Sequence, residues 1–206
     1  MKTLSILILS AAMISSVSFA QDTQTLMGPD TDISFVWGID LKTGTIHEDV
    51  GTLYDVYGGA LFNKSLLLGF AGGMNITHPK LNHGYIGLMA QYTLNPEKVL
   101  HYSGQILLAT ASAKGYTNEK SSAMDNMGNF TGPAFYIVEP GVNAELNLTP
   151  KSRLVVGLSY RYVTGFDDLT FTQTANWDES TGTEYTFTEE DMRGLEFNIG
   201  VKIGLY

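Results

Sequence analysis

Between Ala134 and Leu205 the side chains alternate between an apolar row and a row of glycine, polar and charged residues. Over residues 153–162 the apolar row is Leu154, Val156, Leu158, Tyr160 and Tyr162, and the other row is Arg153, Gly157, Ser159 and Arg161. A period of two is that of a β-strand, whose successive side chains point to opposite faces. A soluble barrel turns its apolar row inward, whereas a membrane-spanning barrel turns it toward lipid and keeps the polar row inside. One almost wholly apolar row beside a row of glycine, polar and charged residues is the pattern of membrane-spanning β-strands, which we therefore predict.

The first 20 residues have the features of a secretory signal peptide. Lys2 precedes an apolar run from Leu4 to Ile14, and small residues follow. We expect cleavage before Gln21, which leaves one domain over residues 21–206. No other stretch approaches the roughly 20 apolar residues that a spanning helix needs. Strands would therefore have to cross the membrane.

The acidic balance of the mature chain limits its partners. Without the first 20 residues, 11 basic and 21 acidic residues remain, a formal net charge of 11 − 21 = −10 at pH 7. Such a chain is poorly suited to nucleic acid, whose phosphates require basic surfaces. The sequence holds no cysteine, so disulfides and thiolate zinc sites are excluded. We expect no cofactor.

The alternation and the turn signals divide the mature chain into eight strands. These cover residues 31–41, 51–62, 64–75, 82–94, 99–112, 132–148, 152–165 and 192–206. Short turns are expected at Asn63–Lys64, Asn95–Lys98 and Thr149–Lys151, and longer loops at 42–50, 76–81, 113–131 and 166–191. Short turns at one rim and long loops at the other are typical of outer-membrane barrels, whose long loops lie outside the cell.

The signal peptide, the eight alternating strands, the three turn signals and the aromatic C-terminus resemble the small outer-membrane barrels of the OmpA transmembrane-domain and OmpX type. Residues 139–147 and 158–161 are also similar to segments of uncharacterised secreted barrels, which implies no activity. The resemblance implies an all-β, eight-stranded antiparallel up-and-down transmembrane barrel in the outer membrane. We expect a monomer in contact with outer-membrane lipid. Tyr206 is one residue out of phase with the apolar row, so either a bulge near Gly204 restores the phase or the chain ends at the rim.

Charged residues of the inward row are expected to meet in the barrel interior. Counted from the short-turn rim, Arg161, Glu139 and Glu196 lie at about the same height on three neighbouring strands. Asp40, on the first strand beside the last one, would join them. We favour a polar plug that fills a narrow barrel. The alternative is a gated path for protons or cations.

A second inward set lies nearer the short-turn rim and consists of His101, Ser103, Glu145 and Lys202. The spacing of the first three is similar to the Ser-His-Glu triad of outer-membrane barrels that deacylate lipid A. Those enzymes act at the outer leaflet, whereas this set is expected at the opposite end and inside. We therefore interpret it as an internal hydrogen-bonding set and predict no catalytic residue.

Three histidines fall in or beside the expected loops, namely His47, His78 and His83. A metal site would need three or four converging ligands, and we favour solvated loop residues and no metal site. The acidic residues between Asp178 and Asp191 could hold divalent cations, but a charge run of this kind more often keeps the surface soluble.

A rigid barrel that carries long loops suits recognition. We therefore expect a structural role in the cell envelope, or binding of an extracellular ligand or protein through residues 113–131 and 166–191. Two alternatives stay open. A wet path past Arg161 would make the barrel an ion or small-solute pore, and a polar set open to lipid would make it a lipid-modifying enzyme.

Overall fold

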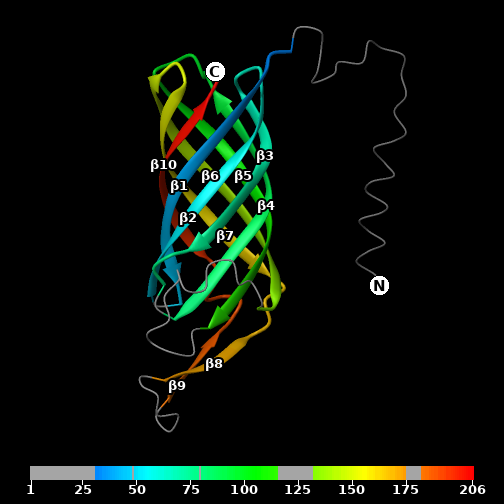
Figure 1. Ribbon diagram of the computed structural model, residues 1–206, viewed down its shortest axis with the longest axis vertical. Coiled ribbons are helices and arrows are strands. Elements are labelled where there is room, and N and C mark those ends of the chain that lie inside the picture. Colours follow the sequence, from blue (N-terminus) through cyan, green and yellow to red (C-terminus); the bar gives the residue numbers. More distant parts are fainter. Residues whose placement is uncertain (1–30, 48, 79, 116–131, 175–181) are drawn as a thin grey trace, which may run out of the picture. The chain divides into compact units, whose positions relative to one another are not determined.

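The computed structural model describes residues 31–47, 49–78, 80–115, 132–174 and 182–206, and these form strands joined by turns and loops. The strands are β1 (Ile33–Ile46), β2 (Asp49–Phe62), β3 (Leu66–Asn75), β4 (Leu81–Leu94), β5 (Leu100–Gly115), β6 (Ala134–Thr149), β7 (Ser152–Thr164), β8 (Leu169–Thr174), β9 (Gly182–Phe187) and β10 (Gly194–Gly204). Eight of them close into an antiparallel barrel in the order β1-β10-β7-β6-β5-β4-β3-β2 (Figure 1). The predicted fold class is confirmed. In the described part of the chain, no helix is long and apolar enough to cross a membrane.

The outer wall of the barrel is apolar. Leu158, Ile199 and Leu108, taken from three different strands, expose 53%, 44% and 50% of their surface, and inward neighbours such as Arg161 are buried. In water this arrangement would leave a whole row of large apolar side chains exposed to solvent. In a bilayer the same row meets hydrocarbon, and barrel closure leaves no strand edge without hydrogen-bond partners. The predicted orientation of the two rows is therefore confirmed.

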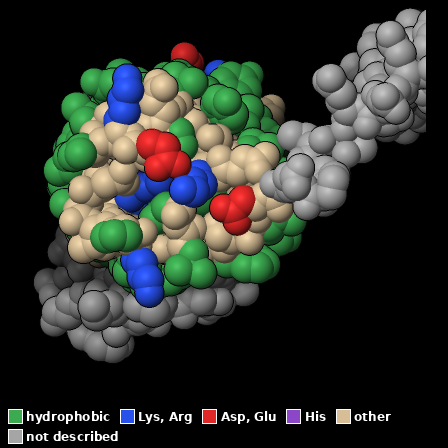
Figure 2. Space-filling model, turned by 90° about the horizontal axis from the view of Figure 1, so that it is seen from above, with side chains coloured by type: hydrophobic (Ala, Val, Ile, Leu, Met, Phe, Trp, Pro, Cys, Tyr) green, Lys and Arg blue, Asp and Glu red, His purple; other side chains and the backbone are tan. Residues whose placement is uncertain are grey.

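The short turns and the C-terminus lie at one rim, at the top of Figure 1. At the β2–β3 turn, Asn63 and Lys64 adopt φ values of 49° and 58°. Phe62 pairs with Leu66, so residues 63–65 form the loop, and the amide of Ser65 donates to the carbonyl of Phe62 at 3.0 Å to close the turn. Seen from this side, charged side chains gather over the rim and hydrophobic ones flank it (Figure 2).

The expected long loop at residues 42–50 is wrong. β1 continues to Ile46 and pairs with β2 through to Asp49, so the connection is a tight turn at His47, whose φ is 55°. The exposed side chains of Thr43 and Thr45 are polar, and the apolar alternation therefore stops before the strand does. A strand that extends beyond the hydrocarbon no longer needs apolar side chains on its outer face.

The expected loop at 166–191 contains structure of its own. β8 and β9 form an antiparallel hairpin with Leu169 opposite Phe187 and Phe171 opposite Tyr185, beyond the end of the barrel wall (Figure 1). β5 continues to Gly115, so the expected loop at residues 113–131 begins later than predicted. The rest of that loop, residues 116–131, lies outside the described residues.

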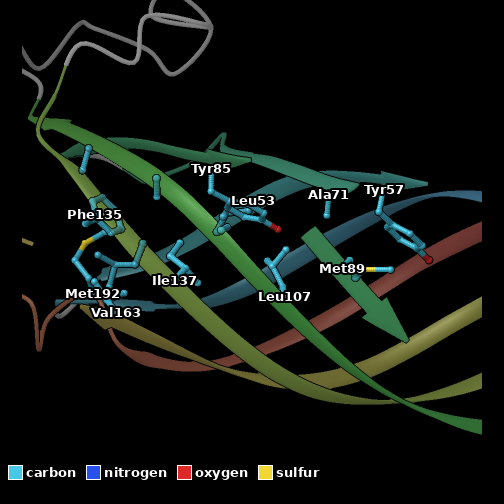
Figure 3. Close-up of a cluster of buried hydrophobic side chains, with 14 of the residues drawn as sticks. Leu53, Tyr57, Ala71, Tyr85, Met89, Leu107, Phe135, Ile137, Val163 and Met192 are labelled. Carbon is cyan, nitrogen blue, oxygen red and sulfur yellow. The ribbon is translucent and has the colours of Figure 1, made fainter. Parts of the chain in front are cut away.

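The barrel interior has a polar part and an apolar part. The buried charged residues extend from Lys202, near the short-turn rim, to Arg161, near the long loops. Buried apolar side chains line the rest of the interior, from Leu61 beside the β2–β3 turn to the long-loop end. At that end Phe135, Ile137, Val163 and Met192 pack together (Figure 3). The sequence interpretation expected polar side chains along the whole interior, so this apolar part is a correction.

Candidate functional site

Glu145 on β6 is the centre of the polar network near the short-turn rim. Its carboxylate is completely buried. Oε1 accepts hydrogen bonds from Lys202 Nζ at 2.7 Å, Ser103 Oγ at 2.7 Å and Gln91 Nε2 at 2.8 Å, and Oε2 lies 3.3 Å from both Arg153 Nη1 and His101 Nε2. The structure thus brings together all four members of the predicted second set. Two buried cations share one carboxylate, which is the pairing that a buried charge requires.

The same contacts do not form a catalytic triad. A triad serine donates its proton to the histidine, whereas Ser103 donates to Glu145. Both ring nitrogens of His101 already face oxygen atoms, one from Glu145 and one from the carbonyl of Lys98 at 2.9 Å. The hydroxyl, the imidazole and the carboxylate are all buried inside the barrel, away from the apolar outer wall. This geometry suits a structural network and provides no access for a lipid ester.

A second network in the barrel interior is centred on Lys42 of β1. Its Nζ lies 2.7 Å from Asp55 and 2.9 Å from Glu139, and it donates a hydrogen bond to Tyr85 Oη at 3.0 Å. Tyr85 in turn donates to Asp55. Sequence reasoning missed Lys42 because the polar outward residues beside it were assigned to a loop. The signal that could have found it is its parity, since Lys42 is in phase with Asp40 on the inward row of β1.

Arg161 joins the wall to the connection between β7 and β10. It donates to Glu196 at 2.6 Å and, through Nε, to the backbone carbonyl of Met192 at 2.7 Å. The register on either side puts Glu139 opposite Arg161, because Val138 pairs with Tyr162 and Gly141 with Ser159. Glu139 nevertheless forms its ion pair with Lys42 across the interior.

The expected single cluster of three carboxylates around one guanidinium is therefore wrong in its membership. Asp40 is buried but forms no ion pair with any residue that the structure describes, and its Oδ1 lies where a side chain on Gly200 would have to be. The prediction compared only the heights of these residues along their strands and did not consider the lengths of their side chains. The long side chain of Lys42 enters the interior and pairs with Glu139, which was expected at Arg161, and with Asp55, which was not in the expected cluster.

The apolar part of the interior closes the barrel next to these charges. Leu53, Leu107, Phe135, Ile137 and Val163 come from four strands and are each at most 2% exposed. Phe187 and Met192, from the long connection between β7 and β10, complete this apolar plug and are fully buried. A signal for it exists in the sequence, where Leu107-Leu108 and Phe135-Tyr136-Ile137-Val138 are apolar at both phases. An apolar run of this kind indicates burial on both faces of a strand.

The β8–β9 hairpin packs on the barrel through aromatic contacts. We define the cap as this hairpin together with residues 188–192. The Phe187 ring stacks on Phe171 at 5.8 Å and lies 5.3 Å from the His47 ring and 6.0 Å from the His78 ring. His47 Nδ1 lies 2.9 Å from Asp191. Burial acts to raise the pKa of Asp191, but hydrogen bonds from His47 and Thr188 outweigh it and lower the pKa.

The histidines were expected to be solvated loop residues, which is wrong for two of the three. His78 is 2% exposed and His83, in β4, is 1% exposed. The His78 ring contacts Phe187 of the apolar plug, and His83 pairs with Ala113 of the same buried apolar cluster. The sequence interpretation did not locate this cluster. Among the described residues, no group of three histidine or acidic side chains is placed to hold a metal ion. Asp178 and Glu179 lie outside the described residues.

His78 gives the cap a predictable response to acid. Its Nδ1 accepts hydrogen bonds from the backbone amides of Lys80 and Leu81, so the proton is on Nε2, which faces the carbonyl of Ile46. Burial disfavours the charged imidazole and lowers the pKa of His78 below its ordinary 6.5. Protonation would break both amide contacts. The stability that neutral His78 contributes is therefore complete above pH 6.5 and is lost as the pH falls toward the lowered folded-state pKa.

We expect the wild-type protein to lose more heat resistance than the His78→Gln variant when the pH is lowered through 6.5. Glutamine can still accept an amide hydrogen bond but does not titrate. The measurement is the melting temperature of the folded band in detergent at a series of pH values. Parallel curves for the two proteins would contradict the role given to His78.

Tyr206 ends the chain inside the short-turn rim. Arg153 lies over its ring, with Cζ 3.6 Å from the ring centre. Leu205 remains exposed and Gly204 donates to the carbonyl of Lys151, so the alternation continues without a bulge. Of the two alternatives, the chain therefore ends at the rim, with its aromatic residue turned toward the interior.

Comparisons with known proteins agree on the fold. No protein-family profile and no curated protein matches the sequence. Among solved structures, Neisserial surface protein A is 12% identical with a TM-score of 0.51, covering 84% of this chain and 97% of that one. The N-terminal β-barrel domain of Pseudomonas aeruginosa OprF is 13% identical with a TM-score of 0.53, over 83% and 96%. A major outer membrane protein from Thermus thermophilus is 12% identical with a TM-score of 0.52, over 82% and 99%.

The chain has the fold of the small eight-stranded outer-membrane barrels. Its apolar wall is the surface that such a barrel presents to lipid. Fold and wall together are those of a membrane-spanning β-barrel. Identities this low extend to the fold alone, so the role of the protein depends on its own interior and cap.

Proposed function

We propose that the protein is a non-conducting, non-enzymatic outer-membrane barrel that presents its cap to an extracellular partner. The observation that carries the proposal is the apolar plug, which includes Leu107 and Phe135 and fills the barrel beneath the cap. A plugged barrel is a rigid support for whatever lies above it. The cap packs on the plug through Phe187 and Met192, and this ordering makes it a preformed surface.

The outward face of the hairpin suits a protein partner. Thr170, Thr172, Glu184 and Thr186 lie on this face and are exposed, whereas Phe171 and Phe187 lie on the opposite face. No described strand pairs with the outer edges of the β8–β9 sheet. Unpaired edges can accept an extended strand from another protein, and the threonine hydroxyls can contribute hydrogen bonds.

Photo-crosslinking in living cells tests the proposal, because it captures a partner whose identity is not known in advance. A photoreactive amino acid replaces Thr172 on the hairpin in one variant and Glu97, which is exposed at the opposite rim, in a matched control. We expect the Thr172 variant to give one discrete adduct after illumination and the Glu97 variant to lack it. Equal adducts from both positions, or none from Thr172 in cells that display the folded protein, would overturn the proposal.

The pore alternative gives a different result in planar bilayers. We expect no conductance steps above background from the wild-type protein, because Leu53, Phe135 and Ile137 occupy the interior. Steps whose ion selectivity changes in Arg161→Ala would support a conducting path past this residue. The folded state of both proteins is checked by the shift of the unheated gel band.

A further inference from the structure

The outer wall of the barrel has a groove of about 540 Å³ across β2 to β6. The strand register aligns five of its lining residues in one row, namely Tyr54, Met74, Gly84, Ser112 and Ala134. These positions belong to the outward phase, which elsewhere carries Phe70, Leu88 and Leu108. The groove exists because three neighbouring strands contribute small residues where the wall otherwise has large ones.

Gly72 deepens the groove in the next row, between Val56 of β2 and Ile86 of β4. A Cβ built on Gly72 would meet only the carbonyl oxygen of Tyr85, at 3.4 Å, which is an ordinary contact. The backbone therefore does not require glycine at this position. The missing side chain leaves space on the lipid side that a larger residue could fill.

The surroundings of the groove determine what can occupy it. It opens on the apolar wall that faces hydrocarbon, and its lining is largely apolar, with Val56, Met74 and Ile86 among the residues. Its volume lies within the roughly 300–1,000 Å³ of small-molecule sites. An occupant must come from the bilayer and must be apolar over this length.

Lys114 lies at the end of the groove near the long loops. Lys114 follows Ser112 on the outward phase of β5, is exposed, and forms no ion pair with any residue in the described ranges. Two residues of strand separate them, a rise of roughly 7 Å. An ammonium group there is placed for the phosphate of a lipid whose chain lies below it.

We propose that this groove binds one acyl chain of an anionic outer-leaflet lipid, with the lipid phosphate at Lys114. The lipid fills the space that Gly72 and Gly84 leave in the wall and so forms part of the folded surface. The proposal does not depend on partner binding by the cap, because the two sites share no residue.

Native mass spectrometry of the detergent-solubilised protein tests the proposal. The probe is an equimolar mixture of dimyristoyl phosphatidylglycerol and dimyristoyl phosphatidylcholine. Gly72→Leu fills the groove, whereas Gly104→Leu is the matched control, because Gly104 is exposed on β5 and a Cβ there meets nothing within 4 Å. We expect about a tenfold loss of the bound-lipid peak in Gly72→Leu and no loss in Gly104→Leu. Equal lipid binding by both variants would overturn the proposal.

Further variants separate the chain from the head group and keep the test decisive. Lys114→Gln should retain a bound lipid but lose the preference for phosphatidylglycerol, and an unchanged preference would refute the phosphate contact. If Gly72→Leu fails to give the folded gel band, Ser112→Leu fills the same groove from β5. A dimer peak that disappears in the groove variants, without any lipid peak in the wild type, would identify a second copy of the chain as the occupant and overturn the lipid assignment.

Discussion

Replacing Glu145 with glutamine should lower the unfolding free energy of the barrel by about 3–5 kcal/mol, the usual cost of breaking a buried ion pair from one side. Lys202 and Arg153 would lose the only carboxylate that the described residues provide within 4.0 Å. Both side chains are 2% exposed, so water cannot replace the lost charge without local opening. Glutamine keeps the size of the side chain, which limits the effect to the charge.

Chemical unfolding of the protein in detergent measures this loss, and Glu97→Gln is the matched control. Glu97 forms its ion pair with Lys64 on the surface, where such a pair contributes about 0–1 kcal/mol. The double variant Glu145→Gln, Lys202→Met should recover part of the stability, because it removes one of the stranded cations. Similar midpoints for Glu145→Gln and Glu97→Gln would show that the network around Glu145 does not stabilise the fold.

The apolar wall and the barrel closure were predictable because the bilayer imposes them residue by residue. Hydrocarbon accepts only apolar side chains on the outer face, so Leu158, Ile199 and Leu108 had to alternate with polar neighbours. The same reasoning located Glu145 with His101, Ser103 and Lys202, since these positions lie within strands whose outer face is apolar.

Prediction from the alternation was weaker beyond the hydrocarbon. There the outward residues of β1 are Thr43 and Thr45, whose polar side chains are typical of a loop. Residues 42–50 were therefore predicted to form a loop, and Lys42 was not included among the interior residues. The apolar plug was not predicted for a related reason. Phe135 and Ile137 face inward on a strand whose outward residues are also apolar. Such segments carry no period of two, and only the contacts formed on folding show which face is which.

The interior network near the plug gives the second large expected effect. Arg161→Met should destabilise the barrel by about 3–5 kcal/mol, because it strands Glu196 and leaves the buried carbonyl of Met192 without its donor. Glu139→Ala should cost less, since Lys42 keeps its second carboxylate, Asp55, at 2.7 Å. The difference follows from the number of alternative partners that each variant leaves in place.

The comparison uses the heat resistance of the folded gel band and proteolysis of the cap. Arg161 also holds the connection that carries Met192, so Arg161→Met should expose the cap to protease at temperatures where Glu139→Ala remains intact. The double variant Arg161→Met, Glu196→Met separates the two contributions of the arginine. It should restore global stability in part, because no carboxylate is left stranded. Proteolysis of the cap should stay fast, because the contact to the Met192 carbonyl is still missing. Equal heat resistance of Arg161→Met and Glu139→Ala would mean that the interior rearranges to compensate for either loss.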